Sequence, residues 1–230
     1  MQLFYAPDIV LEEQLPSEEA KHCIKILRHT VGDIIDVTDG KGSFYSCEIL
    51  NTSKCALKII LTTTEKVSTR HRLHLAVAPT KNGERTDWMI EKLVEFGIDE
   101  ITFLSCAHNE RHKMNLERCN RIAISAMKQS LKATLPKIND LISFKEYISL
   151  TSTNNYSKYI AHCDATFSRQ EINTTSASKN VNCCIGPEGD FSKQEIAYAL
   201  EKGFEGIALG DSRLRTETAA MAVCSYFYFN

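Results

Sequence analysis

Two glycine-bearing turns in the last third of the chain constrain its fold more than any other feature. The first spans residues 185–192, with the sequence IGPEGDFS, and the second spans residues 209–218, with the sequence LGDSRLRTET. Each follows a short apolar run typical of a buried strand, 181–185 or 207–209, and each carries hydroxyl or acidic side chains of the kind that begin helices. We therefore predict two strand-to-helix turns.

These turns are expected to wall one pocket. Ligands of open parallel sheets settle at the edge where the carboxyl ends of the strands meet. Gly186 and Gly189 permit positive φ or a close backbone approach to a ligand, and Pro187 fixes its own φ, which leaves backbone amides free to face a guest. The alternative is a tight connection without a ligand. Neither turn fits the dinucleotide or P-loop fingerprint, so a phosphate cradle is disfavoured.

The paired turns resemble the signature of a known family. IGPEG, followed at short range by LGxxxLRTET, is similar to the double motif of the RsmE family, which methylates N3 of a uridine in 16S ribosomal RNA of the small subunit. That family belongs to the SPOUT class, whose C-terminal segment is threaded into a trefoil knot that holds S-adenosyl-L-methionine. The resemblance implies an α/β fold with a C-terminal SPOUT trefoil-knotted methyltransferase domain.

Composition sets outer bounds on the class of protein. The 230 residues, 43% hydrophobic and 24% charged, are typical of a globular chain long enough for a proper core. A net charge of −2 argues weakly against a nucleic-acid partner. Nine scattered cysteines without a Cys-x-x-Cys pair, and no charged-then-apolar leader, favour free buried thiols in the cytoplasm and no metal site. No apolar run is long enough for a membrane span.

Residues 1–69 are predicted to be mostly β. Segments 33–38 and 43–50 alternate around the turn 39–42, which indicates a hairpin, and another strand is expected at 55–62. A helix is expected between Ser17, as N-cap, and residues 27–29. The family resemblance implies that this part is a small PUA-like RNA-binding β-barrel. In it, Arg28 either meets an RNA phosphate or caps the end of its helix.

The polar stretch 62–72, with Lys66, Arg70 and Arg72, is the predicted domain boundary, so the second domain is 70–230. Strands then alternate with helices, which indicates a parallel α/β sheet. The segment 164–180 is polar and long for a compact domain, so we expect it to be disordered or a mobile flap. The expected strands of the second domain are 73–78, 101–104 and 159–163. The expected helices are 86–96, which ends at Gly97, then 143–150, then a helix that begins after the N-cap Ser192, and finally 218–229.

Residues 111–137 are rich in cations, because they include seven Lys or Arg residues and a single acid, Glu117. Arg118, Arg121, Ser125, Lys128 and Lys132 follow steps of three or four and would form one stripe on a helix. Such stripes are usually solvated faces, but the lack of compensating acids favours a phosphate backbone. Cys119 and Lys132 depart from the family pattern and leave the exact contact open. With the basic pair that the family places near residue 81, the expected RNA-binding residues are Arg28, Lys81, Arg85, Arg111, Arg118, Arg121, Lys128 and Lys132.

The resemblance also assigns the site residues. Methyl transfer from a sulfonium needs no metal. The uracil must lose its N3 proton, and the negative charge that this leaves spreads onto O2 and O4 of the base. Arg215 is expected to hold that charge or the uridine phosphate, and Glu217 to orient Arg215 or accept the proton; alternatively the two merely pair and cap the last helix. The end of the strand that leads to His162 is expected to touch the cofactor, and His162 itself is either catalytic or structural. The expected cofactor-binding residues are Ala161, His162, Ile185, Gly186, Pro187, Glu188, Gly189, Leu209, Gly210, Leu214 and Thr216.

Several alternatives stay open at this point. Because N3 lies on the pairing edge, the target must be unpaired or flipped out. The closing helix is expected to contribute to a homodimer, as in the SPOUT class. The substrate is either naked 16S ribosomal RNA or the assembled small subunit. A noncatalytic RNA-binding assembly factor, or a SPOUT enzyme acting on another RNA position, is the alternative function.

Overall fold

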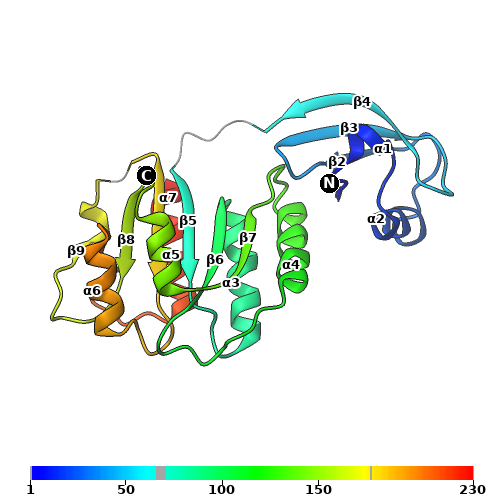
Figure 1. Cartoon of the computed structure of the whole chain (residues 1–230). Helices are drawn as coiled ribbons and strands as arrows, with labels where there is room; N and C mark the ends of the chain where they lie inside the picture. Colours follow the sequence, from blue (N-terminus) through cyan, green and yellow to red (C-terminus); the bar gives the residue numbers. More distant parts are fainter. Residues whose placement is uncertain (1, 66–70, 177, 230) are drawn as a thin grey trace. The chain divides into compact units, whose positions relative to one another are not determined.

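The structure, a computed structural model, describes residues 2–65, 71–176 and 178–229 (Figure 1). The chain divides into two compact units, one of Met1–Ser68 with Ala123–Leu135 and one of Thr69–Ile122 with Pro136–Asn230. The boundary predicted between residues 69 and 70 lies outside the described residues, as do Lys66 and Arg70 of the predicted linker. Within the described ranges, no helix combines the length and the apolar character needed to cross a bilayer.

The first unit contains a four-stranded sheet in the order β1 (Leu3–Tyr5), β2 (Ile34–Thr38), β3 (Ser43–Ile49) and β4 (Leu57–Thr64). β1 runs parallel to β2, and the other pairs are antiparallel, which confirms the predicted hairpin. Alternation puts Val37, Cys47, Ile49 and Leu57 into the core beside Phe4.

The hairpin turn is held by one carboxylate. Asp39 Oδ1 accepts hydrogen bonds from the backbone N–H groups of Lys41 and Ser43, at 2.7 and 3.2 Å, and Oδ2 accepts one from the Tyr45 hydroxyl at 3.0 Å. Gly40 and Gly42 adopt φ of 72° and 107°, a region that glycine enters without steric cost. The turn predicted at residues 39–42 is therefore present.

The helix near Ser17 differs from its prediction. After the short α1 (Ile9–Glu12), α2 covers Ser17–Lys21, and Pro16 stands at its N-cap without a side-chain capping bond. The expected Ser17 cap is therefore wrong, because Ser17 is already the first helical residue. The chain continues as a π-helix over His22–Ile26, and Arg28 at φ 60° ends it.

A segment from the middle of the chain completes the first unit. The division into units falls within α4 (Leu116–Gln129). Beyond this helix, the Ala133 carbonyl accepts from Gly42 N–H at 3.0 Å and from the Thr38 hydroxyl at 3.2 Å, and Ala133 N–H donates to Glu65 Oε2 at 3.1 Å. No periodicity in the sequence signals this pairing, because it joins residues between 68 and 95 positions apart.

The second unit is built on a parallel sheet, which confirms the predicted α/β class. Its described strands lie in the order β7-β6-β5-β10-β8-β11-β9, and each neighbouring pair is parallel. Their bounds are β5 Arg72–Val77, β6 Glu100–Ser105, β7 Lys137–Ser143, β8 Ser157–Ala161, β9 Gln170–Glu171, β10 Asn180–Ile185 and β11 Glu205–Ala208.

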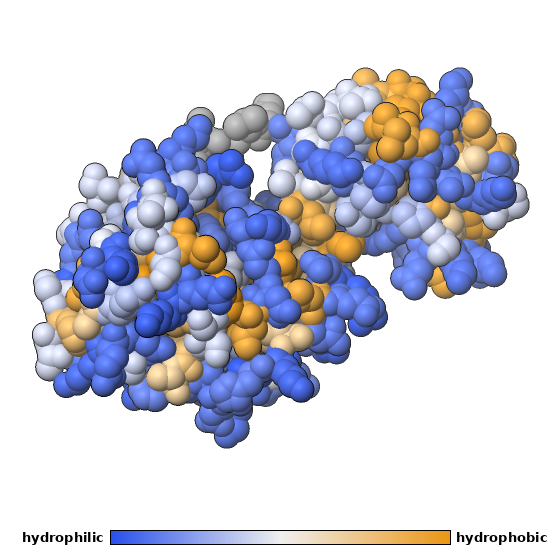
Figure 2. Space-filling view, in the orientation of Figure 1, coloured by the Kyte–Doolittle hydropathy of each residue, from blue (hydrophilic) through white to orange (hydrophobic). Residues whose placement is uncertain are grey.

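Helices cover both faces of this sheet (Figure 1). α5 (Phe144–Thr151) and α6 (Lys193–Glu201) share one apolar cluster with the strands, while α7 (Thr216–Phe229) packs on the other face against α3 (Gly83–Phe96), β5 and β10. The first cluster includes Ala76, Leu104, Phe144, Ile148, Ile160, Cys184, Ile196 and Ala199. The face of the molecule in view is mostly hydrophilic, with small apolar patches (Figure 2).

Helix ends follow the local chemistry that the sequence indicated. Ser192 and Glu195 form a capping box on α6, and Gly97 ends α3 at φ 81°. α3 begins three residues before the prediction because the Asn82 side chain accepts from Glu84 N–H. α7 begins at Thr216, two residues early.

Two parts of the second unit differ from what the sequence indicated. β7 was missed, because its apolar and polar residues alternate only weakly and its side chains are half-buried or exposed. In the segment expected to be disordered or a flap, β9 pairs with β11, and a 3₁₀ turn covers Ile172–Thr174; residue 177 lies outside the described residues.

Candidate functional site

A cavity of about 290 Å³ lies at the carboxyl ends of β8, β10 and β11. This is the edge at which parallel sheets bind ligands. All but one of the residues expected to bind the cofactor line it, namely Ala161, His162, Ile185, Gly186, Pro187, Glu188, Leu209, Gly210, Leu214 and Thr216. Gly189 is the exception. It packs against His108, where an added Cβ would lie 2.9 Å from the His108 Cβ.

The two glycine turns are fastened to each other. The Thr216 hydroxyl donates a hydrogen bond to the Gly186 carbonyl at 2.9 Å, in a buried position. A second bond, from Arg213 Nη2 to the Glu188 carbonyl, measures 3.3 Å. The predicted neighbourhood of the two turns is therefore present, and Thr216 fixes it.

Further contacts hold the first turn from the outside. Glu188 Oε1 accepts from the Lys81 N–H at 3.0 Å, and Asp190 Oδ2 accepts from the Cys163 N–H at 2.8 Å. The Lys81 ammonium pairs with Glu110 at 2.6 Å. Carboxylates thus tie the turn to the loop after β5 and to the end of β8.

His162 contributes a neutral ring to the cavity. The residue is 3% exposed, and neither ring nitrogen has a hydrogen-bond partner among the described residues. Burial lowers the pKa of the imidazole, so the ring is neutral at neutral pH. Its ring meets Phe167 edge-on at 6.2 Å between centroids.

The cysteines are free thiols, and eight of the nine are buried. Burial raises the pKa of Cys23 to about 12 and that of Cys47 to about 11, so both thiols stay protonated. Cys163 departs from the expectation of buried thiols, since it is exposed and lines the cavity. Among the residues that the structure describes, no group of three His, Cys, Asp or Glu side chains could hold a metal ion.

A wider groove of about 700 Å³ adjoins the cavity, and Arg213, Leu214 and Arg215 line both. Its other walls come from the start of α3 and the start of α7, namely Asn82, Glu84, Arg85, Trp88, Glu217 and Thr218. Sequence reasoning missed Trp88. The available signal was its position one turn after Arg85 on a predicted helix.

Glu217 is the buried charge of this groove. The residue is 7% exposed, and its Oε1 lies 3.8 Å from Arg85 Nε. Its Oε2 is buried without a hydrogen-bond partner within the described residues. The alternative in which Glu217 pairs with Arg215 is therefore wrong for this structure, because Arg85 takes that place and Arg215 is exposed.

Two cations of the stripe predicted on α4, Arg118 and Lys128, form ion pairs with acids that lie outside residues 111–137. Arg118 donates two hydrogen bonds to Asp87 Oδ2, from Nε at 2.9 Å and from Nη2 at 2.6 Å. Lys128 pairs with Glu19 at 2.5 Å. The argument from uncompensated charge is therefore wrong for both, because the acids come from helices distant in sequence.

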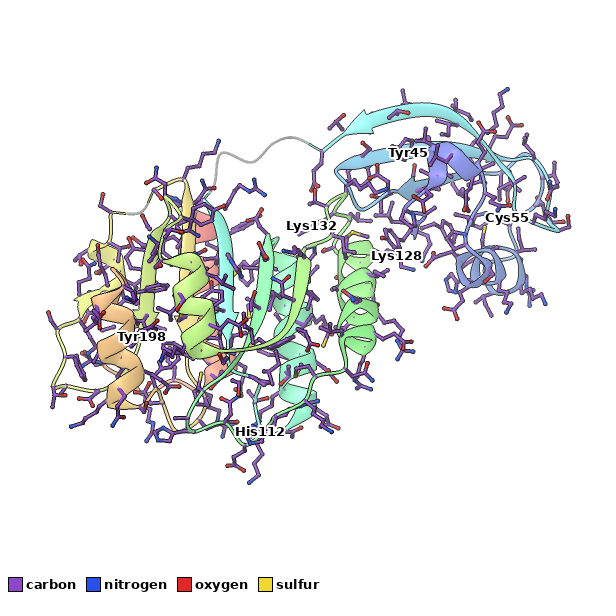
Figure 3. The ribbon with its side chains drawn as sticks, in the orientation of Figure 1. Tyr45, Cys55, His112, Lys128, Lys132 and Tyr198 are labelled. Carbon is purple, nitrogen blue, oxygen red and sulfur yellow. The ribbon has the colours of Figure 1, made fainter. Side chains whose placement is uncertain are left out.

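The remaining predicted RNA-binding cations lie in different settings. Arg121 is exposed on α4 without an ion pair in the described ranges, and Arg28 is exposed after the π-helix. Arg111 packs over Gly83 and donates to the Lys113 carbonyl at 3.2 Å. Lys132 lies beyond the end of α4 and so outside the helical stripe, whereas Lys128 lies on the helix (Figure 3).

Replacing Thr216 by Val tests the fastening of the two turns. We expect the free energy of unfolding, measured by urea denaturation, to fall by about 1–3 kcal/mol, because the Gly186 carbonyl stays buried without its donor. Thr216→Ser keeps the hydroxyl and serves as the matched control. A Val variant as stable as the Ser variant would show that this bond contributes nothing.

Comparisons with known proteins agree with this geometry. An RNA methyltransferase domain matches residues 67–228, and an RNA methyltransferase PUA domain matches residues 15–62. A probable rRNA-methyltransferase from Porphyromonas gingivalis is 41% identical, with a TM-score of 0.92 over 100% of this chain and 98% of that one. Ribosomal RNA small subunit methyltransferase E from Neisseria gonorrhoeae, solved with S-adenosyl methionine bound, is 26% identical, with a TM-score of 0.85 over 98% of this chain and 95% of that one.

A curated relative covers nearly the same span. Ribosomal RNA small subunit methyltransferase E from Buchnera aphidicola is 29% identical over 94% of this chain and 90% of its own length. The two domain matches follow one another along the chain, and together they cover β2, β3 and most of β4 in the first unit and the whole parallel sheet of the second. The chain therefore belongs to the RsmE family of RNA methyltransferases, with a PUA domain at its N-terminus and a SPOUT methyltransferase domain after it.

Proposed function

We propose that this protein is an S-adenosyl-L-methionine-dependent methyltransferase that methylates N3 of a uridine in 16S ribosomal RNA in the cytoplasm. The observation that carries the proposal is the pair of adjoining hollows, a cavity walled by the two glycine turns and a groove that holds a buried carboxylate, with Arg215 at their junction. The relative solved with S-adenosyl methionine bound supports the choice of methyl donor.

The cavity fits such a donor chemically. Its volume is close to the lower end of ordinary ligand pockets, and Ile185, Ile207 and Leu209 give it apolar walls. When bound, S-adenosyl-L-methionine supplies a methyl group on a positively charged sulfonium. The neutral His162 ring adds no further positive charge to a cavity that Arg169, Arg213 and Arg215 already line. We assign cofactor binding to the residues that line the cavity, and to Gly189 the shaping of the turn.

In the groove, we assign the proton of uracil N3 to Glu217. Its buried Oε2 has no hydrogen-bond partner among the described residues, and the ion pair between its Oε1 and Arg85 holds the carboxylate in place. The N3–H bond of the base would break toward this oxygen, and the freed electron pair on N3 would form the new nitrogen–carbon bond as the carbon–sulfur bond of the donor breaks and the sulfur leaves as a neutral thioether. Arg215, at the junction of the two hollows, stabilises the charge that spreads onto the uracil oxygens.

The strand order supports the knot of the SPOUT class. β10 lies between β5 and β8, β11 lies on the far side of β8, and the chain then returns to α7, which packs against β5 and β10. We propose that this return passes through the preceding loop as a trefoil knot. We also propose a homodimer through α7, whose last residues Tyr228 and Phe229 are 38% and 73% exposed.

We assign RNA binding to both units. Residues 1–69 are proposed as the PUA-like domain and residues 70–230 as the methyltransferase domain, with residues 123–135 packed into the first unit. Among the candidate cations on α4, Arg121 is the most available for a phosphate because it is exposed and unpaired within the described residues. Arg118 and Lys128 must give up an acid to bind one.

Mass spectrometry of 16S ribosomal RNA tests the proposed function. RNA from cells that lack this protein should carry an unmodified uridine at one position, and the purified protein should restore N3-methyluridine there, on naked RNA or on the assembled subunit. Binding of S-adenosyl-L-methionine is measured separately by calorimetry. A protein that fails to bind S-adenosyl-L-methionine and leaves the RNA unchanged would favour a noncatalytic assembly factor. A methyl group at another position of the RNA would favour another SPOUT reaction.

Arg215→Ala and Glu217→Gln test the catalytic assignment. We expect kcat to fall about 100- to 1,000-fold for Arg215→Ala and about 100- to 10,000-fold for Glu217→Gln, since charge stabilisation and proton transfer contribute such factors. The Kd for S-adenosyl-L-methionine should change little in either variant. An equal loss of kcat and cofactor affinity would mean that the side chain only shapes the pocket.

Arg121→Ala tests the RNA contact of α4. The affinity for 16S ribosomal RNA fragments should fall, and the slope of log affinity against log salt should become shallower by about 0.7, because one phosphate contact is lost. Arg118→Ala is the matched control, and we expect a smaller change because Asp87 already engages that guanidinium. Equal changes in the two variants, measured by fluorescence anisotropy, would contradict this ranking.

A further inference from the structure

We propose that the groove between α3 and α7 is a uridine-specific nucleotide subsite, in which Trp88 stacks on the base and Glu217 reads its N3–H. The inference rests on the proposed function and names the substrate contacts of that site. The groove meets the cavity of the glycine turns through Arg213, Leu214 and Arg215, so a base held in it lies at the border of the cavity.

Trp88 is placed as a binding residue and not as a core residue. On α3, the packing face carries Met89, Ile90 and Leu93, all fully buried. Trp88 lies off that face, is 46% exposed and lines the groove beside charged residues. A large aromatic surface left open to water next to cations is well suited to stack on a nucleobase.

A flipped base needs such a platform. An unpaired nucleotide that leaves its helix loses its stacking partners, and the protein must replace them. Trp88 offers the aromatic face, and Arg85 and Arg215 offer cations for the phosphate or the carbonyl oxygens of the base. Stacking tolerates any base, however, so the aromatic residue alone cannot select uridine.

Glu217 supplies the selection. Its Oε2 is a buried acceptor without a donor in the described residues, and Arg85 approaches only the other oxygen, at 3.8 Å. Uracil carries a hydrogen on N3 and satisfies this acceptor. Cytosine carries a lone pair on N3, which would face the carboxylate oxygen and leave it unpaired. Sites with buried polar groups of this kind reject analogues that lack the matching group by large factors.

The fluorescence of Trp88 tests the stacking directly, because it is the only tryptophan of the chain. We titrate the intact protein, with S-adenosyl-L-methionine present, with oligouridylate and with an abasic oligomer of the same length and charge. Oligouridylate should quench the emission in a saturable manner, and the abasic oligomer should leave it unchanged. Oligocytidylate should bind about 10-fold or more weaker than oligouridylate, and Glu217→Gln should narrow that difference.

Variants connect the stacking to the reaction. Trp88→Ala should lower kcat/KM for methylation of 16S ribosomal RNA about 10- to 100-fold, Trp88→Phe should retain most of it, and neither should change the Kd for S-adenosyl-L-methionine. Tyr156→Ala, which removes an aromatic residue that is 38% exposed outside the groove, is the matched control and should leave kcat/KM unchanged.

The outcomes separate this inference from the proposed function. Wild-type protein that methylates RNA while Trp88 emission ignores oligouridylate, with Trp88→Ala fully active, would overturn the nucleotide subsite and leave the methyltransferase intact. Emission that shifts to the blue with protein concentration and ignores RNA would show that a second copy of the chain covers Trp88, which also overturns the inference. Wild-type protein that transfers no methyl group to RNA would overturn the proposed function itself.

Discussion

The hydrogen bond from the Thr216 hydroxyl to the Gly186 carbonyl is the contact on which the candidate site depends. It joins two turns that lie 30 residues apart in the chain and fixes the first helical residue of α7 against the end of β10. The cavity at the strand ends exists because these turns stay together. Parallel strands contribute by delivering both turns to the same edge of the sheet.

The start of α7 also places the carboxylate of Glu217 at a position where it does not favour the stability of the fold. Glu217 follows Thr216 and is buried, and in the part of the chain that the structure describes its ion-pair partner is Arg85, at 3.8 Å. Removing a charge from water costs several kcal/mol, and one long ion pair returns only part of that cost. An apolar residue at this position would suit the fold at least as well. The arrangement is therefore better explained by what the groove binds than by what holds the helix.

Charge compensation is the point at which local sequence reasoning failed. A count along residues 111–137 found one acid, yet Asp87 and Glu19 reach Arg118 and Lys128 from other helices. The Glu217–Arg215 pair failed for the same reason, since Arg85 approaches from α3. Ion pairs form between whichever side chains packing brings within a few ångströms, and spacing along one helix cannot reveal them. The strand β7 and the early start of α3 were missed because weak alternation and a single Asn cap leave little signal.

The sequence by itself determined the parallel α/β class, the hairpin of the first unit, the capping box at Ser192 and the two glycine turns, because each rests on periodicity or backbone chemistry within a few residues. It also contained the double motif that identified the family. Only the tertiary structure decided that Thr216 bonds to Gly186, that residues 123–135 complete the first unit, and that Trp88, Arg85 and Glu217 share one groove. Those contacts join residues far apart in the chain, and their geometry follows from the order in which the strands pack.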